Sequence, residues 1–315
     1  MSSADEIILH HYDASLFSEK IRLAFGLKNL PWRSVIISPI MPRPDLMPLT
    51  GGYRKTPVMQ IGADIYCDTQ CILRELERRF PEPTLYPGAS EGLCWATTMV
   101  ADRPFFQASV AVIFGNMKPS DLQPGFVEDR EKLSGARFDF EAMKARGPYA
   151  KDQWRAYADW IERQLADGRP FLLGASPSLA DLSMFIEVWF LKNAYRGADA
   201  ILAAFPRLRE WDGRVRAIGH GKKTDMTTAE ALAVGTKARP TTVEHADPAE
   251  PNGFKPGDRV GVSPDDYGRI PVNGAVVSSS AQHIAIRRKD PVAGEVVVHF
   301  PRAGFSVVRA EQAEA

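Results

Sequence analysis

The sequence has few cysteines and no long hydrophobic run, and these absences exclude several classes of protein. Its three cysteines, Cys67, Cys71 and Cys94, are an odd and sparse set that forms no disulfide framework and suits a reducing compartment. No run of about eighteen apolar residues occurs, so we expect no membrane span. The polar start MSSADEIILHHYD does not resemble a secretory signal. These features predict a cytoplasmic protein that has no membrane partner.

The chain also lacks an excess of charge of either sign. Lys+Arg and Asp+Glu each number 39, so the overall charge favours neither nucleic acid nor an acidic surface as a partner. The short basic run Arg287–Lys289 is typical of a solvated strand face, and nucleic acid is not an expected partner. Cys67 and Cys71 have no matching histidines nearby in the sequence, so we expect buried small side chains and no metal site.

Changes of pattern along the 315 residues predict several domains. Residues 5–86 alternate strand-like and helix-like segments, which predicts a small α/β domain. Residues 90–238 are mostly amphipathic or apolar helical segments, which predicts an all-helical bundle. The Pro- and charge-rich residues 239–251 are typical of a linker. Residues 252–312 contain short alternating runs separated by Gly, Pro and Asp, which predicts a small all-β barrel.

The segment RKTPVMQIGADIYCDTQCIL contains two features that point to a binding site. If the Thr56–Pro57 bond is cis, the backbone N–H and C=O of Thr56 face a ligand in extended form. The alternative is a trans proline at the first residue of a strand. Asp68 and Thr69 stand where a helix begins, so they either bind the two charged ends of an amino acid or cap the helix.

Four segments carry a resemblance to a known family. YDASLFSEKIRLAF, RKTPVM, YCDTQCILRELERRF and FLLGASPSLADLSMF resemble, in order and spacing, segments of the cytosolic glutathione transferases. The resemblance covers residues 7–238 and implies a thioredoxin-like domain followed by a helical domain. The predicted C-terminal barrel lies outside it. The sequence departs from the family pattern at Met47–Lys55, where an Asn-Pro is usual, and at Thr69, where serine is commoner.

The resemblance also implies how glutathione is held. Thr56, ahead of a cis Pro57, pairs through its backbone with the cysteinyl part, and Asp68 and Thr69 hold the γ-glutamyl end. Lys55 reaches the glycyl carboxylate or stays a solvated surface lysine. Glutathione is expected as the co-substrate, with no other cofactor.

The group that activates the glutathione thiol is expected at the first strand–helix junction. A free thiol has a pKa of about 8.5, and each unit of lowering needs about 1.4 kcal/mol, within reach of one charge-assisted hydrogen bond. Ser15 stands where serine-type members carry the activating hydroxyl, with Tyr12 and Ser18 as alternatives. Ser15 is also a natural helix N-cap. No cysteine precedes Cys67, so thiol–disulfide exchange by a protein cysteine is not expected.

The resulting hypothesis is a glutathione transferase whose bound thiolate attacks a hydrophobic electrophile. Phe105, Phe106 and Phe114, on a long helix that Pro104 breaks or kinks, are candidates for the electrophile pocket. The family implies a homodimer and a role in detoxification. Two alternatives remain: a non-catalytic binding or assembly module that acts through the C-terminal barrel, and a glutathione-dependent peroxidase or reductase.

Overall fold

The N-terminal segments form a thioredoxin-like domain, as predicted. In the computed structural model, which describes residues 6–310, strand β1 pairs in parallel with β2 and antiparallel with β3, and β3 pairs antiparallel with β4. The elements of this domain are β1 (Ile8–His11), α1 (Leu16–Leu27), β2 (Pro31–Ile36), α2 (Met47–Thr50), β3 (Val58–Ile61), β4 (Asp64–Cys67) and α3 (Thr69–Arg79).

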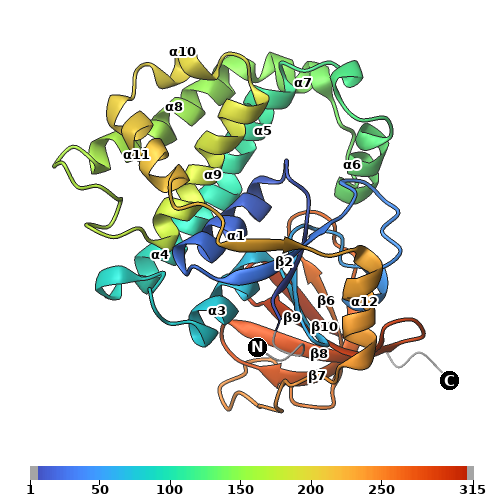
Figure 1. The fold of residues 1–315 in the computed structure, drawn as a ribbon. Helices are drawn as coiled ribbons and strands as arrows, with labels where there is room; N and C mark the ends of the chain where they lie inside the picture. Colours follow the sequence, from blue (N-terminus) through green and yellow to red (C-terminus); the bar gives the residue numbers. More distant parts are fainter. Residues whose placement is uncertain (1–5, 311–315) are drawn as a thin grey trace.

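The helical domain follows and surrounds a central helix, α9 (Figure 1). Helix α9 is apolar on nearly all sides because it contacts α1, α4, α5, α10 and α11. The elements are η1 (Pro87–Ala89), α4 (Glu91–Val100), η2 (Ala101–Phe105), α5 (Phe106–Phe114), η3 (Pro119–Asp121), α6 (Phe126–Ser134), α7 (Phe140–Ala145), α8 (Gly147–Gln164), α9 (Leu179–Ala194), α10 (Ala198–Leu202) and α11 (Pro206–Arg216). Segment η2 is a π-helical turn that contains Pro104, the residue predicted to interrupt this helix.

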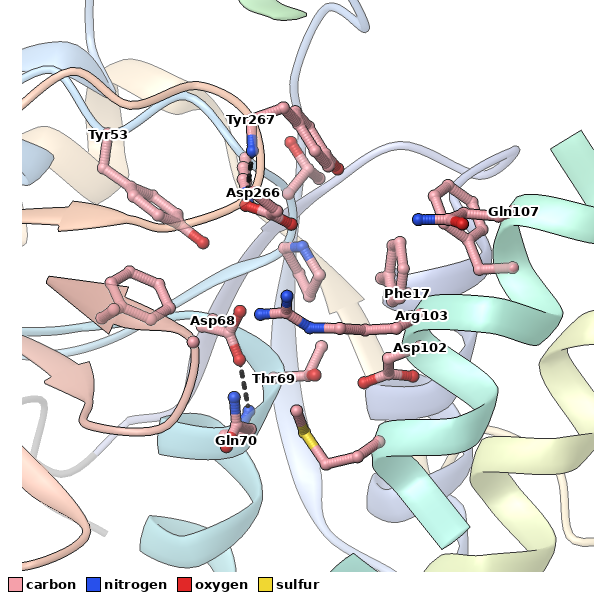
Figure 2. Close-up of a pocket in the computed structure, with 17 residues that line it drawn as sticks. Phe17, Tyr53, Asp68, Thr69, Gln70, Asp102, Arg103, Gln107, Asp266 and Tyr267 are labelled. Carbon is pink, nitrogen blue, oxygen red and sulfur yellow. Dashed lines mark hydrogen bonds and ion pairs between the residues drawn. The ribbon is translucent and has the colours of Figure 1, made fainter. Parts of the chain in front are cut away.

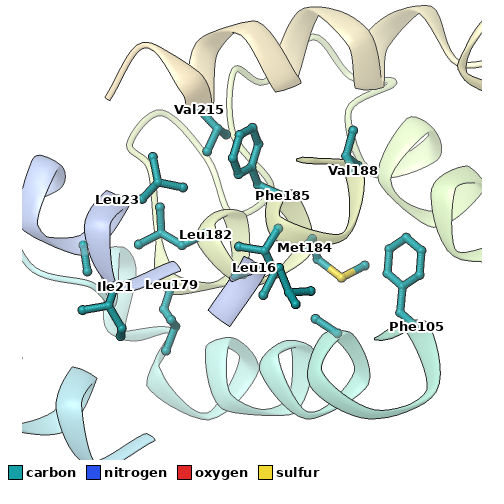
Figure 3. Packing of buried hydrophobic residues seen from close by; sticks show 14 of the residues in the cluster. Leu16, Ile21, Leu23, Phe105, Leu179, Leu182, Met184, Phe185, Val188 and Val215 are labelled. Atoms are coloured by element: carbon teal, nitrogen blue, oxygen red, sulfur yellow. The ribbon is translucent and has the colours of Figure 1, made fainter. Parts of the chain in front are cut away.

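The two domains share one hydrophobic core, which lies between α1 and α9. Figure 3 shows Leu16, Ile21 and Leu23 of α1 close to residues of α9, including Leu182 and Phe185. Burying each side chain of this size contributes about 1.5–3 kcal/mol relative to leaving it in water. Helix α1 is therefore covered on both sides, by the sheet and by the bundle, and its first turn is held in place between them.

After the bundle, a strand and a helix precede five C-terminal strands, which form the predicted β region and, beyond the small barrel that the sequence predicted, continue the thioredoxin-like sheet. The elements are β5 (Lys222–Asp225), α12 (Thr228–Lys237), β6 (Arg259–Pro264), β7 (Val272–Ser279), β8 (His283–Asp290), β9 (Gly294–Pro301) and β10 (Phe305–Arg309). Within residues 6–310 one sheet has the order β10-β6-β7-β8-β9-β4-β3-β1-β2-β5. Strand β9 pairs in parallel with β4, and β5 pairs in parallel with β2. Both edges of the thioredoxin-like sheet are thus covered by later parts of the chain.

A second core lies on the opposite face of the sheet. Alternating side chains of β1 point to the two faces, so Leu9 packs toward the bundle while Ile8 packs with residues of the C-terminal strands such as Val298. Helix α12 lies on this second face, and its Ala231 carbonyl accepts a hydrogen bond of 2.9 Å from Nε2 of Gln60. Figure 1 shows the C-terminal strands below the thioredoxin-like domain and α12 beside them. We refer to residues 254–310 as the C-terminal module.

Candidate functional site

Ser15 lies at the junction of the first strand and the first helix. It is the N-cap of α1, and its Oγ accepts a hydrogen bond of 3.2 Å from the backbone N–H of Ser18. Its side chain is only 3% exposed, yet it lines a large cavity together with Tyr12. An Oγ that accepts a capping bond keeps its own hydrogen, so Ser15 can cap the helix and donate to a ligand at the same time.

Ser18, the third candidate for thiol activation, lies in a different environment. Its side chain is fully buried, and Oγ has no hydrogen-bond partner within residues 6–310. Ser18 does not line either of the two cavities described below. Its contribution in this structure is the backbone N–H that Ser15 caps.

The Thr56–Pro57 bond is cis, one of the two conformations that the sequence allowed. Within residues 6–310 neither the amide nor the carbonyl of Thr56 has a backbone hydrogen-bond partner, and the residue lines both cavities. Arg43 fixes the position of this segment, because its Nη1 donates to Oγ1 of Thr56 at 3.1 Å and to the Arg54 carbonyl at 2.7 Å. The Thr56 peptide groups are therefore fixed and free to bind an extended ligand.

Asp68 and Thr69 lie at the start of α3, facing a cavity that contains several charged side chains and that we call the polar cavity. Asp68 is the N-cap of this helix with φ 74°, and its Oδ1 accepts from the Gln70 amide at 2.9 Å. Burial raises the pKa of Asp68, while the Gln70 hydrogen bond and the Lys55 ammonium act in the opposite direction. A ligand ammonium would favour the ionised form further.

This polar cavity has a volume of about 190 Å³ and lies where the three parts of the chain meet. Besides Lys55, Thr56, Pro57, Asp68 and Thr69, its lining includes residues that the sequence analysis missed. These are chiefly Asp102 and Arg103 of η2 and Asp266, Tyr267 and Gly304 of the C-terminal module. Figure 2 shows Arg103 extending across the cavity toward Asp68.

Of the lining residues that were not predicted, those of η2 had a signal in the sequence, and those of the C-terminal loop had none. Pro104 predicts an irregular helix, and π-helical turns often occur at functional sites, so Asp102 and Arg103 were open to prediction. The loop that carries Asp266 and Tyr267 lies 211 residues from Lys55 along the chain, and no local pattern reports this proximity.

Lys55 is paired rather than solvated. Its ammonium forms an ion pair with Asp266 and lies 4.0 Å from the centre of the Tyr267 ring. The side chain of Lys55 is 14% exposed, so it faces the cavity and not the open solvent.

A second, larger cavity of about 540 Å³ adjoins the first and is mostly apolar. Five residues line both cavities and form the boundary between them: Phe17, Lys55, Thr56, Phe106 and Tyr267. Of the three phenylalanines proposed for an apolar pocket, Phe106 and Phe114 line this cavity. Phe105 does not line it: the ring is fully buried and packs edge-on against Trp154, with 5.4 Å between the ring centres.

The cysteines lie away from both cavities. Cys67, Cys71 and Cys94 are buried and free, and burial raises the pKa of all three thiols. High pKa values keep them protonated and poorly nucleophilic at neutral pH. Within residues 6–310 no group of three or more His, Cys, Asp and Glu side chains is arranged to hold a metal ion. In the same range, no helix combines the length and hydropathy that a membrane crossing needs.

Comparisons with known proteins place this geometry in a family. The family model described as "Glutathione S-transferase, N-terminal domain" matches residues 9–84, and "Glutathione S-transferase, C-terminal domain" matches residues 127–211. A GST-like protein from Pseudomonas syringae has a solved structure that is similar over 97% of this chain and 100% of its own, with 39% identity and a TM-score of 0.81. Comparison with curated proteins gave no match.

Two further structures share the fold of the first two domains. A glutathione S-transferase from Rhodospirillum rubrum F11 is 18% identical over 67% of this chain and 88% of its own, with a TM-score of 0.52. A Tau class glutathione S-transferase from mango is 15% identical over 67% of this chain and 89% of its own, also with a TM-score of 0.52. The similarity to the Pseudomonas protein, by contrast, extends through the C-terminal module. Because both family models match in order and this relative covers nearly the whole chain, the chain belongs to the glutathione S-transferase family.

Proposed function

We propose that this protein binds glutathione, ionises its thiol and directs the thiolate to a hydrophobic electrophile. The observation that carries the proposal is the pair of adjoining cavities, one rich in charged side chains and one mostly apolar, whose shared wall includes Phe17, Thr56 and Phe106. A thiol at this boundary is anchored by polar groups on one side and meets an apolar reactant on the other. Such positioning supplies a large part of the rate of a two-reactant step.

Glutathione occupies the polar cavity in a defined direction. Its γ-glutamyl end lies at Asp68 and Thr69, where the first amides of α3 attract a carboxylate and Asp68 attracts the ammonium. The cysteinyl part pairs with the backbone of Thr56, and the glycyl carboxylate reaches Lys55. This direction places the sulfur beside the larger cavity.

Ser15 stabilises the thiolate. Its hydroxyl hydrogen is free to donate to the sulfur while Oγ keeps the capping bond from Ser18, and the positive end of the α1 dipole points the same way. Tyr12 lines the same cavity and is the alternative donor. Ser18 is assigned no contact with the sulfur, because it lines neither cavity.

The electrophile lies in the apolar cavity against Phe106 and Phe114. In conjugation, the sulfur lone pair forms the new S–C bond and the electrophile accepts the electrons and a proton. In displacement, the S–C bond forms as a halide leaves with the electron pair of the broken bond. Neither step needs a protein cysteine, which agrees with the burial of all three thiols and gives no support to a disulfide reductase. We propose a cytoplasmic homodimer with a role in detoxification, as the family implies.

The ultraviolet absorbance of the thiolate tests this proposal. The signal is titrated against pH with glutathione bound to the wild type and to the variants Ser15→Ala, Tyr12→Phe and Ser18→Ala. We expect a bound-thiol pKa well below that of free glutathione, a rise toward the free value in Ser15→Ala, and no change in Ser18→Ala. A rise only in Tyr12→Phe would make the phenol the activator. Binding without a thiolate signal would favour a binding or assembly module, and absence of binding would refute the proposal.

A further inference from the structure

The two cations of the polar cavity are both held by one loop of the C-terminal module. Lys55 pairs with Asp266, and Nη2 of Arg103 lies 2.9 Å from Oδ1 of Asp265. Among the residues that line the cavity, Lys55 and Arg103 are the lysine and arginine side chains. They come from different domains, yet two consecutive aspartates of the module neutralise them. Figure 2 shows Asp266 directed into the same space as Arg103 and Asp68.

This loop is seated against both domains of the transferase fold. The Gly268 amide donates to the Leu133 carbonyl of α6 at 2.9 Å, and Asp266 pairs with Lys55 of the thioredoxin-like domain. Within the module, the Asp265 amide donates at 3.0 Å to the carbonyl of Gly304, in the turn between β9 and β10. Gly304 has φ +82° and lies so close to Arg103 that an added Cβ would be 2.5 Å from Nη2. The next residue before it, Ala303, accepts a hydrogen bond of 3.1 Å from Nε2 of Gln70. The loop and the turn between β9 and β10 therefore form one wall of the cavity together.

Glutathione can form ion pairs with Lys55 and Arg103 only if the pairs with Asp266 and Asp265 break. Glutathione has two carboxylates and one ammonium. Asp68 and Asp102 are available for the ammonium, although Asp102 also pairs with the buried Lys20. The amides of α3 can contact one carboxylate, but the lysine and arginine that could pair with the two carboxylates are Lys55 and Arg103, which Asp266 and Asp265 already hold.

We propose that Arg103 binds the γ-glutamyl carboxylate and Lys55 the glycyl carboxylate, each in exchange for one aspartate of the loop. Lys55 and Arg103 then favour thiol peptides that have a carboxylate at both ends, and Asp265 and Asp266 lower the affinity for glutathione by competing for these cations. This inference rests on the proposed function, and it gives the C-terminal module a role in glutathione binding. The exchange replaces one ion pair with another, so removing the competing carboxylate should tighten binding. For partly exposed pairs of this kind we expect about a two- to fivefold effect.

Calorimetric titration of the full chain tests the exchange with two ligands, glutathione and glutathione esterified at its glycyl carboxylate. We expect Asp265→Asn to bind both ligands about two- to fivefold more tightly, because the γ-glutamyl carboxylate is present in both. We expect Asp266→Asn to bind only glutathione more tightly, because the ester lacks the group that replaces Asp266. Adding Arg103→Gln to Asp265→Asn should abolish the gain.

Asp258→Asn is the matched control, because Asp258 pairs with Arg309 at 3.0 Å in the same module but does not line the cavity. It should bind both ligands as the wild type does, and thermal unfolding should show that every variant is folded. Wild-type binding with unchanged or weaker binding in Asp265→Asn and Asp266→Asn would overturn the exchange alone. An equal gain for the ester in Asp266→Asn would overturn the assignment of Lys55. Absence of glutathione binding in all proteins would refute the proposed function itself.

Discussion

Nε2 of His299 lies 3.1 Å from Oδ1 of Asp64, which joins β9 of the C-terminal module to β4 of the thioredoxin-like domain. Both side chains are buried, and the two residues are 235 positions apart. Asp64 also accepts hydrogen bonds from the amide of Thr241 and from the hydroxyls of Thr241 and Thr242. Although burial opposes its ionisation, the bonds from His299 and Thr242 hold the pKa of Asp64 at about 2. One carboxylate thus fixes the predicted linker and the module to the sheet.

Replacing Asp64 should loosen this junction. Asp64→Asn keeps the shape but loses the charge that His299 and the two threonines contact, so we expect a loss of about 2–4 kcal/mol in unfolding free energy. Urea unfolding at pH 7 measures it. Asp258→Asn, which alters an aspartate at the surface of the same module, should cost much less, because solvent screens its pair with Arg309. Equal losses in the two variants would show that Asp64 has no special role.

Glu187 of α9 should make stability depend on pH. It is fully buried, neither carboxyl oxygen has a hydrogen-bond partner within residues 6–310, and burial raises its pKa to about 8. Because the folded state keeps a proton that the unfolded state releases above about pH 4.5, this residue lowers stability progressively as pH rises to about 8. The slope is about 1.4 kcal/mol per pH unit.

Glu187→Gln removes this titration. The variant should match the wild type near pH 4.5 and exceed it in melting temperature by a growing margin up to about pH 8. Melting curves at a series of pH values give the difference, in which the titration of other groups cancels. A difference that does not change with pH would contradict a buried neutral carboxyl at Glu187.

The two roles of Ser15 can be separated by choice of substitution. Ser15→Ala removes the N-cap and should cost about 1 kcal/mol of stability, whereas Ser15→Gly should cost only a few tenths. Both remove the hydroxyl, so we expect an equal rise of the bound-thiol pKa in the two variants. Thermal unfolding and the thiolate titration measure the two effects. If the bound-thiol pKa rose in Ser15→Ala but not in Ser15→Gly, the rise would reflect the loss of stability, and Ser15 would act only as a helix cap.

Two helical glycines should respond to alanine in opposite ways. In α1, a Cβ on Gly26 would lie 1.9 Å from the carbonyl oxygen of Gly219, so Gly26→Ala should cost about 3 kcal/mol or more. In α11, a Cβ on Gly213 would meet nothing within 4 Å, so Gly213→Ala should stabilise the protein by about 0.5–1 kcal/mol. Denaturant unfolding of both variants checks the contrast. Tolerance of alanine at Gly26 would contradict the close approach of α1 to residues 218–220.

Local patterns predicted most elements of the first two domains. The apolar runs around β1 and β2, the N-cap at Ser15 and the helix at Asp68–Thr69 depend on neighbours within a few residues. Strand β5 was missed, because its four residues, KKTD, are polar and exposed. It forms a strand because the edge of β2 offers hydrogen bonds to it, and no hydrophobic alternation marks such a segment.

The candidate site was predictable only in part, for the same reason. Ser15, Thr56, Asp68 and Thr69 belong to short segments whose chemistry can be interpreted in order along the chain, and the fold brings them to the polar and apolar cavities. Ser18 lies in the helix that Ser15 caps, and Phe105 is the last residue of η2, but the direction of each side chain depends on what packs beside it. Ser18 is buried away from both cavities, and Phe105 packs against Trp154.

By itself, the sequence determined a small α/β domain followed by a helical bundle, because periodicity, capping and turn chemistry are local, and its resemblance to the glutathione transferases implied the thioredoxin-like fold and the residues at the first helix and the proline loop. Only the tertiary structure decided that β9 joins β4, and that Asp265 and Asp266 hold Arg103 and Lys55. These contacts link residues more than 150 positions apart. An unpaired strand edge gains hydrogen bonds from any strand that the fold brings beside it, and a buried charge is stabilised by any nearby opposite charge. The local sequence around the edge or the charge does not indicate which distant segment will supply that strand or charge.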